Sequence, residues 1–254
     1  METDPWLRRR RTWEVWLVLG ASLLYSASYA VIRIVERLTA PTPLGEQTTA
    51  LNPSMATRSL FDLSYQLNSI VFTLVPVALA LFLLAGDRSN PFRRIGFDLS
   101  MPLRDLGGAL AIGAAIGIPG LAFYVIGREI GITVSINPAA LQPEWWAIPV
   151  LLLAAAKNAI LEEVLVVGYA LERWRQAGWN WWAASLTSAS VRGAYHLYQG
   201  IGPFFGNLVM GLAFNEAYRR WGRTMPLVLA HFLIDVVAFV GWWLLPDAAR
   251  AVFS

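Results

Sequence analysis

Long apolar runs, separated by short polar or basic segments, dominate the pattern of this chain. Seven runs have the length and composition of helices, and they cover residues 14–38, 63–85, 106–130, 151–173, 181–198, 203–218 and 225–245. A helix needs about 20 mostly apolar residues to cross a bilayer, and these runs approach that length. The pattern therefore predicts an all-α fold, a polytopic transmembrane helix bundle with about seven to eight spans.

Composition agrees with a membrane protein. Hydrophobic residues make up 56% of the chain, charged residues make up 15%, and there are 12 tryptophans. The net charge of +3 comes from arginines between apolar runs, where basic residues set the orientation of a membrane protein. We therefore expect the lipid bilayer as a partner and no nucleic acid, and the basic cluster Arg8–Arg11 predicts a cytoplasmic N-terminus.

Ionisable residues are not spread evenly over the runs. The runs before residue 143 are almost purely apolar inside, whereas those within 143–245 carry glutamates, both histidines, an arginine and an aspartate. No repeat marks a second domain. We predict a single transmembrane domain over residues 1–254, with its catalytic half at about 143–245.

The run 151–173 carries four polar residues in its middle: Lys157, Asn158, Glu162 and Glu163. An ionised side chain at bilayer depth costs about 2.5–3.5 kcal/mol on the lenient insertion scale, so such residues normally face a polar cavity. Neighbours on a helix lie about 100° apart, so we expect the two carboxylates not to reach one atom. One would do chemistry while the other orients it. The alternative is an ion pair, with Lys157 or Arg192, that only joins helices.

Two further runs carry the only histidines of the chain, His196 and His231. Arg192 and His196 are four residues apart, so they share one helix face. His231 and Asp235 have the same spacing, which lets the carboxylate accept a proton from one ring nitrogen and leaves the other for a metal or a water.

A glutamate, two histidines and an aspartate either bind a divalent metal such as zinc or activate a water directly, and both routes lead to hydrolysis. The candidate metal ligands are Glu162, His196 and His231. The chain has no HExxH motif, which favours the general-base route over the metal. It also has no cysteine and no serine in a nucleophile elbow, which excludes the usual covalent mechanisms.

These motifs resemble the CAAX prenyl protease and bacteriocin-processing family (CPBP), whose members are intramembrane endopeptidases. The family pattern has a Glu-Glu pair followed by Arg, then Phe before a His, then a His followed four residues later by Asn or Asp. The matching motifs here are EEVLVVGY at Glu162, RGAYHLYQG around His196, and HFLID from His231 to Asp235. They lie between about residues 157 and 239, in the family's order.

The resemblance implies a role for each matching residue. Glu162 would activate the water, His196 and His231 would bind the water or a metal, Asp235 would orient, and Glu163 would support. It further implies a membrane-associated or lipid-modified peptide or protein as substrate, and the plasma membrane of a bacterium as location.

Two positions depart from the family pattern. Val167 stands where the family commonly has Arg, and Arg192 stands where it commonly has Phe. A guanidinium lost from one helix and gained on another suggests that the positive charge has moved. Arg192 would then pair with Glu163 or hold a substrate carbonyl or carboxylate.

Three functions follow as hypotheses, and the first is an intramembrane endopeptidase that cleaves near the C-terminus of its substrate. The second is a catalytically degenerate member that acts as a peptide-binding, immunity or scaffold protein. The third is a proton-coupled transporter, which the lack of an inverted repeat or paired broken helices disfavours.

Overall fold

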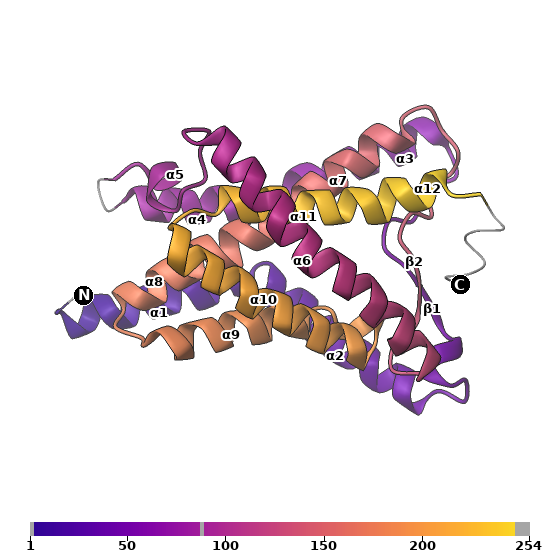
Figure 1. The fold of residues 1–254 in the computed structure, drawn as a ribbon, viewed down its shortest axis with the longest axis horizontal. Helices are drawn as coiled ribbons and strands as arrows, with labels where there is room; N and C mark the ends of the chain where they lie inside the picture. Colours follow the sequence, from indigo (N-terminus) through magenta and orange to yellow (C-terminus); the bar gives the residue numbers. More distant parts are fainter. Residues whose placement is uncertain (1–2, 87–88, 247–254) are drawn as a thin grey trace.

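The structure is a computed structural model that describes residues 3–86 and 89–246. Nearly all elements are helices (Figure 1). In the first half these are α1 (Pro5–Gly20), α2 (Leu23–Thr39), α3 (Ser59–Thr73), α4 (Val75–Ala85), α5 (Pro91–Arg94) and α6 (Pro102–Glu129). In the second half they are α7 (Ala147–Glu162), the π-helix η2 (Glu163–Tyr169), α8 (Ala170–Gln176), α9 (Trp181–Ala194), α10 (Ile201–Trp221), α11 (Met225–Val236), the π-helix η4 (Val237–Gly241) and α12 (Trp242–Leu244). Two short 3-10 turns, η1 (Leu44–Glu46) and η3 (Leu197–Gln199), and strands β1 (Thr48–Ala50) and β2 (Ser135–Asn137) complete the list.

Every predicted run forms helix, but the number of spans is not confirmed. By length and composition, the described residues contain three helices able to cross a membrane: Ser59–Ala85, Pro102–Glu129 and Met225–Leu244. A fourth results if α1 and α2, bent by 56° relative to each other, form one broken span. The remaining runs are shorter or more polar than the pattern suggested. α9 has 14 residues, which at 1.5 Å per residue is shorter than the roughly 30 Å hydrocarbon layer.

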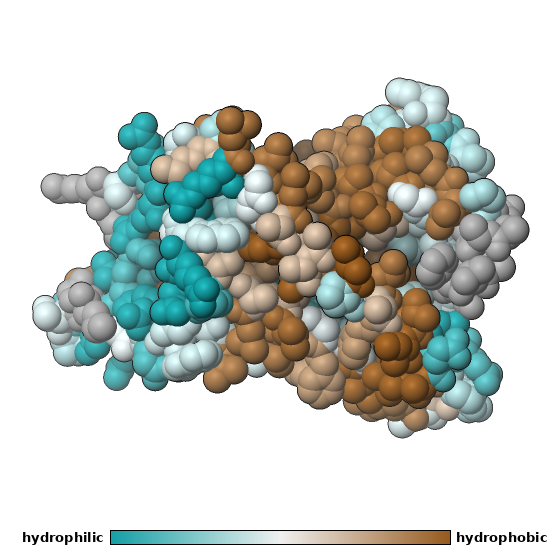
Figure 2. Space-filling view, viewed as in Figure 1, coloured by the Kyte–Doolittle hydropathy of each residue, from teal (hydrophilic) through white to brown (hydrophobic). Residues whose placement is uncertain are grey.

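The molecular surface has the character of an integral membrane protein. Figure 2 shows a broad hydrophobic region between two more hydrophilic ends. Large apolar side chains are exposed on the helices, including Phe72, Phe82 and Ile118, which are 66%, 75% and 71% exposed. A soluble monomer rarely exposes so much contiguous apolar surface, so this region faces lipid.

Helices of the second half pack closely around one buried polar centre. α11 packs against both α6 and α7, and α9 packs against α10. In Figure 1, α6 runs diagonally across the face of the molecule, with α7 and α11 along one edge and α9 and α10 along the other. Gly193 permits the α9–α10 contact, because a Cβ at this position would lie 2.8 Å from the Phe204 carbonyl oxygen.

Two loop contacts fix the ends of this half. At the end distant from the N-terminus, β1 and β2 form a two-stranded parallel sheet (Figure 1). There Gly200, with φ +122°, comes so close to the backbone that a Cβ would lie 2.5 Å from the Ile132 oxygen. This contact anchors the chain just after α9 and η3.

At the opposite end, Arg223, just before α11, contacts both the first turn of α6 and the loop that precedes α6. Its guanidinium donates two hydrogen bonds to Asp105, at 2.8 and 2.7 Å, and one to the Asp98 carboxylate at 3.0 Å. The backbone N–H of Thr224 also donates to the Ile95 oxygen. The helix that carries His231 is therefore fixed at its N-terminal end.

Candidate active site

Glu162 and Glu163 lie where the α-helix α7 changes to the π-helix η2. A π-helical segment inside an α-helix is rare and occurs frequently at functional sites, because it changes the direction of the side chains. Glu163 is completely buried and the Glu162 side chain is 12% exposed. One ligand atom from each of Glu162, Glu163 and His231 lies within 4.8 Å of the others. The flexible glutamate side chains and the change of helix type thus bring the two carboxylates close together, although each accepts hydrogen bonds from different donors.

Arg192 of α9 is the buried cation between the two glutamates. Its Nη2 donates to both oxygens of Glu163, at 2.7 and 2.8 Å. Its Nη1 lies 3.7 Å from Glu162 Oε2. This pairing confirms the expected partner for Glu163, whereas Lys157, the alternative partner, forms no ion pair within residues 3–86 and 89–246.

Val167, at the position where the resembled family has arginine, is completely buried in the apolar core. It lies in η2, four residues after Glu163. The guanidinium that contacts Glu163 thus comes from α9 and not from the glutamates' own helix.

His231 of α11 is oriented by Glu163. Its Nδ1 lies 2.7 Å from Glu163 Oε1, and since a carboxylate only accepts, Nδ1 carries the proton. Its Nε2 lies 3.7 Å from Asp235 Oδ1, which is too long for a hydrogen bond. The expected hydrogen bond between His231 and Asp235 is therefore not formed, although the two groups lie within ion-pair distance. The i, i+4 spacing brings the two residues near each other, but the carboxylate of another helix takes the ring proton.

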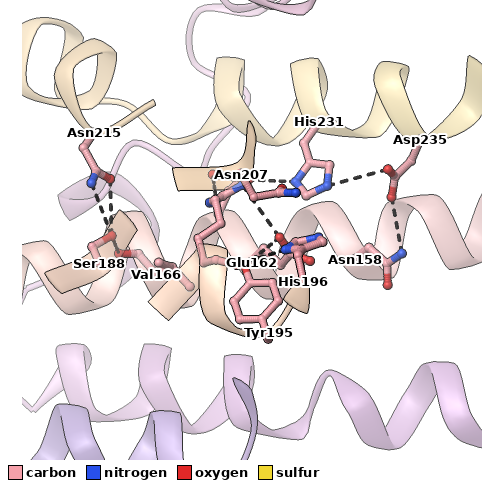
Figure 3. Close-up of polar contacts among 12 residues, drawn as sticks. Asn158, Glu162, Val166, Ser188, Tyr195, His196, Asn207, Asn215, His231 and Asp235 are labelled. Carbon is pink, nitrogen blue, oxygen red and sulfur yellow. Dashed lines mark hydrogen bonds and ion pairs between the residues drawn. The ribbon is translucent and has the colours of Figure 1, made fainter. Parts of the chain in front are cut away.

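Asp235 accepts a hydrogen bond from Asn158 of α7 at 3.3 Å (Figure 3). Asn158 lies four residues before Glu162, on the same helix face. Asp235 therefore joins α11 to α7 beside the glutamates.

His196 lies two residues after the end of α9, and its ring is held by the last turn of that helix. Nδ1 lies 2.9 Å from the Arg192 carbonyl oxygen, which accepts, so Nε2 is the unprotonated nitrogen of a neutral ring. The His196 ring packs against Tyr195, whose hydroxyl donates to Glu162, so His196 lies beside the glutamates. The structure thus brings together residues that the sequence places on three separate helices.

Tyr195 is the site residue that the sequence interpretation missed. Its hydroxyl donates to Glu162 Oε2 at 2.7 Å (Figure 3), and its ring packs against His196 with centroids 4.7 Å apart. The available signal was its place directly before His196. That position alone does not reveal a carboxylate contact across 33 residues of chain.

A second cluster of polar residues, outside the glutamate site, forms hydrogen bonds that reach the backbone of the π-helix η2. The Ser188 hydroxyl of α9 donates to the Val166 carbonyl oxygen at 2.9 Å (Figure 3). Asn215 of α10 donates to the backbone and hydroxyl oxygens of Ser185, at 3.0 and 3.1 Å, and to the Ser188 hydroxyl at 3.3 Å. Asn215 thus joins α10 to α9, whereas Asn207 bonds within α10, to the Pro203 oxygen.

The donor set fits a divalent metal poorly. A metal needs carboxylate lone pairs directed at it, but both oxygens of Glu163 already accept from Arg192, and one also accepts from His231. The guanidinium next to Glu162 and Glu163 also repels a cation. Arg192 is fully buried, so solvent does not screen that repulsion.

Comparison with known proteins identifies the same part of the chain. Residues 144–237 match a family model described as Rce1-like, type II CAAX prenyl endopeptidase. The matched region begins just before α7 and ends just after α11, so it contains all the site residues. No curated protein and no solved structure matches the chain.

Proposed function

Because residues 144–237 match a family model described as Rce1-like, type II CAAX prenyl endopeptidase, we propose that this integral membrane protein belongs to that family and hydrolyses a peptide bond through a water activated by Glu162. The substrate is a membrane-associated or lipid-modified protein or peptide, cleaved near its C-terminus. The observation that carries the proposal is the contact of two intramembrane carboxylates with one buried guanidinium and one imidazole. So many ionisable groups inside an apolar bundle mark a functional site.

The first step takes place at Glu162 Oε1, which has no hydrogen-bond partner among the described residues. A water donates one proton to this oxygen and attacks the scissile carbonyl carbon, which forms a tetrahedral intermediate. The unprotonated Nε2 of His196 accepts the second hydrogen of the water and orients it. Glu162 then passes its proton to the leaving amine as the C–N bond breaks.

The oxyanion of the intermediate requires a hydrogen-bond donor. Nη1 of Arg192 is buried, has no hydrogen-bond partner among the described residues, and lies 3.7 Å from Glu162 Oε2. A buried donor without a partner is costly, and donation to a developing negative charge gives it a function. We assign this role to Arg192. No step of this reaction uses a metal.

The test is cleavage of C-terminal peptide libraries by the purified protein in detergent. Glu162→Gln keeps the size of the side chain but removes its basicity, so we expect activity to fall by about 10²–10⁴-fold. The matched control is Glu216→Gln on α10, where the glutamate pairs with Arg219 and Arg220 at the surface and should be dispensable. Wild-type activity should persist in a chelator. A Glu162→Gln variant as active as the wild type would overturn the proposal.

A further inference from the structure

The two oxygens of the Glu162 carboxylate have different surroundings. Oε2 accepts a hydrogen bond from the Tyr195 hydroxyl at 2.7 Å and lies 3.7 Å from Arg192 Nη1. Both groups come from the last turn of α9 and the residue that follows it, three positions apart. Oε1 has no hydrogen-bond partner in the described part of the chain. One face of the carboxylate is thus held by protein, and the other remains for water.

Tyr195 is well placed to maintain this difference. Its side chain is 5% exposed, and its ring is fixed against His196. A glutamate carboxylate rotates easily about its last bond, whose torsion is broad and roughly two-fold. A hydrogen bond from a fixed phenol to Oε2 prevents this rotation, because a charged acceptor makes the bond stronger than a neutral one.

We propose that Tyr195 is a positioning residue of the hydrolysis, whose hydroxyl holds Oε2 of Glu162 so that Oε1 faces the attacking water. This inference rests on the proposed function of Glu162 as the base. It assigns Tyr195 a second effect during the reaction. After Oε1 has taken the proton of the water, the phenol still donates to Oε2, so the proton stays on the oxygen that faces the leaving amine.

The experiment compares Tyr195→Phe with Tyr198→Phe, both made in the full-length protein. Each change removes only a hydroxyl, and the Tyr198 hydroxyl contacts the Gln199 side chain instead of a carboxylate. For Tyr195→Phe we expect kcat to fall about ten- to hundredfold, the effect of losing one hydrogen bond to a charged group, with KM changed less than about twofold. Tyr198→Phe should keep the wild-type kcat.

A background variant distinguishes positioning from a merely structural role. In Glu162→Asp the carboxylate is one methylene shorter, so it withdraws from the Tyr195 hydroxyl. Adding Tyr195→Phe to this variant should then lower kcat by less than about threefold, because the interaction is already lost. If the two changes instead multiply fully, Tyr195 acts independently of Glu162 and the inference fails.

The two levels of the proposal fail in different ways. Should Glu162→Gln retain full activity, the proposed function itself is wrong. Should Glu162→Gln be inactive while Tyr195→Phe keeps a kcat within about threefold of the wild type, only the assignment of Tyr195 is wrong. A parallel loss of thermal stability and kcat in Tyr195→Phe, with KM raised, would likewise refute the positioning role.

Discussion

A single arginine holds the carboxylates of the site together. Arg192 contacts Glu163 through two hydrogen bonds and approaches Glu162, while Val167 fills an apolar position where the resembled family has arginine. If the positive charge has moved from position 167 to position 192, an arginine at position 167 should restore part of the stability and activity that are lost when Arg192 is replaced.

The exchange can be tested directly by mutation. Arg192→Phe leaves Glu163 buried without its cation, which should destabilise the protein by about 3–5 kcal/mol and remove most activity. Val167→Arg alone should also be damaging, because it adds an unpaired charge to the core. The double variant Val167→Arg/Arg192→Phe should recover a measurable part of both stability and activity, assayed by thermal unfolding and peptide cleavage. A double variant no better than Arg192→Phe would show that the two positions are not equivalent.

At the residue scale, the sequence predicted the identity of the polar residues better than their partners. The order of motifs singled out Glu162, His196 and His231, and the structure brings these residues into one site. Their hydrogen bonds were harder to predict, because spacing within one helix reveals only neighbours on that helix. For this reason Asp235 was assigned to His231, and the contact of Tyr195 with Glu162 was missed.

The site depends on the π-helix η2, because Glu163 is the first residue of this element and its side-chain direction is set by it. Ser188 of α9 donates to the Val166 carbonyl within η2 and accepts a hydrogen bond from Asn215 of α10. These two hydrogen bonds link α9 and α10 to the backbone of η2. Helical periodicity in the sequence does not distinguish a π-helix from an α-helix, so η2 was not predicted.

Ser188→Ala should weaken this element. Loss of a buried donor leaves the Val166 carbonyl with less hydrogen bonding, at a cost of about 1–3 kcal/mol of stability. Peptide cleavage should fall as well, because the direction of Glu163 depends on η2. The control is Ser64→Ala, where an exposed hydroxyl bonds only to the Leu60 carbonyl of its own helix. Equal stability of the two variants, measured by thermal unfolding in detergent, would contradict this account.

The loop before α6 gives a pH-dependent prediction. Hydrogen bonds from the Ser100 hydroxyl and backbone N–H, followed by the contact with Arg223, lower the pKa of Asp98 from its ordinary 3.8 to about 2. A group whose pKa is lower in the folded state stabilises the protein above its ordinary pKa. Its contribution is lost as the pH falls through the folded-state pKa.

Asp98→Asn should therefore lower the unfolding temperature at about pH 7, and the difference should be the same at about pH 5. It should shrink below pH 3.8 and vanish near pH 2. A difference that disappears already between pH 7 and 5 would assign the effect to another group.

At the scale of the whole molecule, the apolar surface and the two polar ends define how the protein sits in a bilayer. The N-terminus and α5 lie at one end, whereas β1 and β2 lie at the other (Figure 1). The all-α class followed from periodicity, because long apolar helical runs are a strong signal. The number of spans did not, since a helix such as α9, with 14 residues, packs against its neighbours without being long enough to cross the bilayer.

The absence of native cysteine makes the orientation measurable. Single cysteines at the exposed positions Arg9 and Arg93 should be labelled from the cytoplasmic side by a membrane-impermeant thiol reagent, as the basic cluster at the N-terminus predicts. A cysteine at exposed Glu46, in the loop before β1, should be labelled only from the opposite side. Labelling of Arg9→Cys and Glu46→Cys from the same side would contradict the topology.

An experimental structure of the protein in lipid, at a resolution that shows ordered water, tests the central claim most directly. The account predicts one water bonded to Glu162 Oε1 and within reach of the Nε2 atoms of His196 and His231, with Tyr195 on Oε2 and Arg192 on Glu163. It would be contradicted if Glu162, His196 and His231 faced separate surroundings that no single water could bridge.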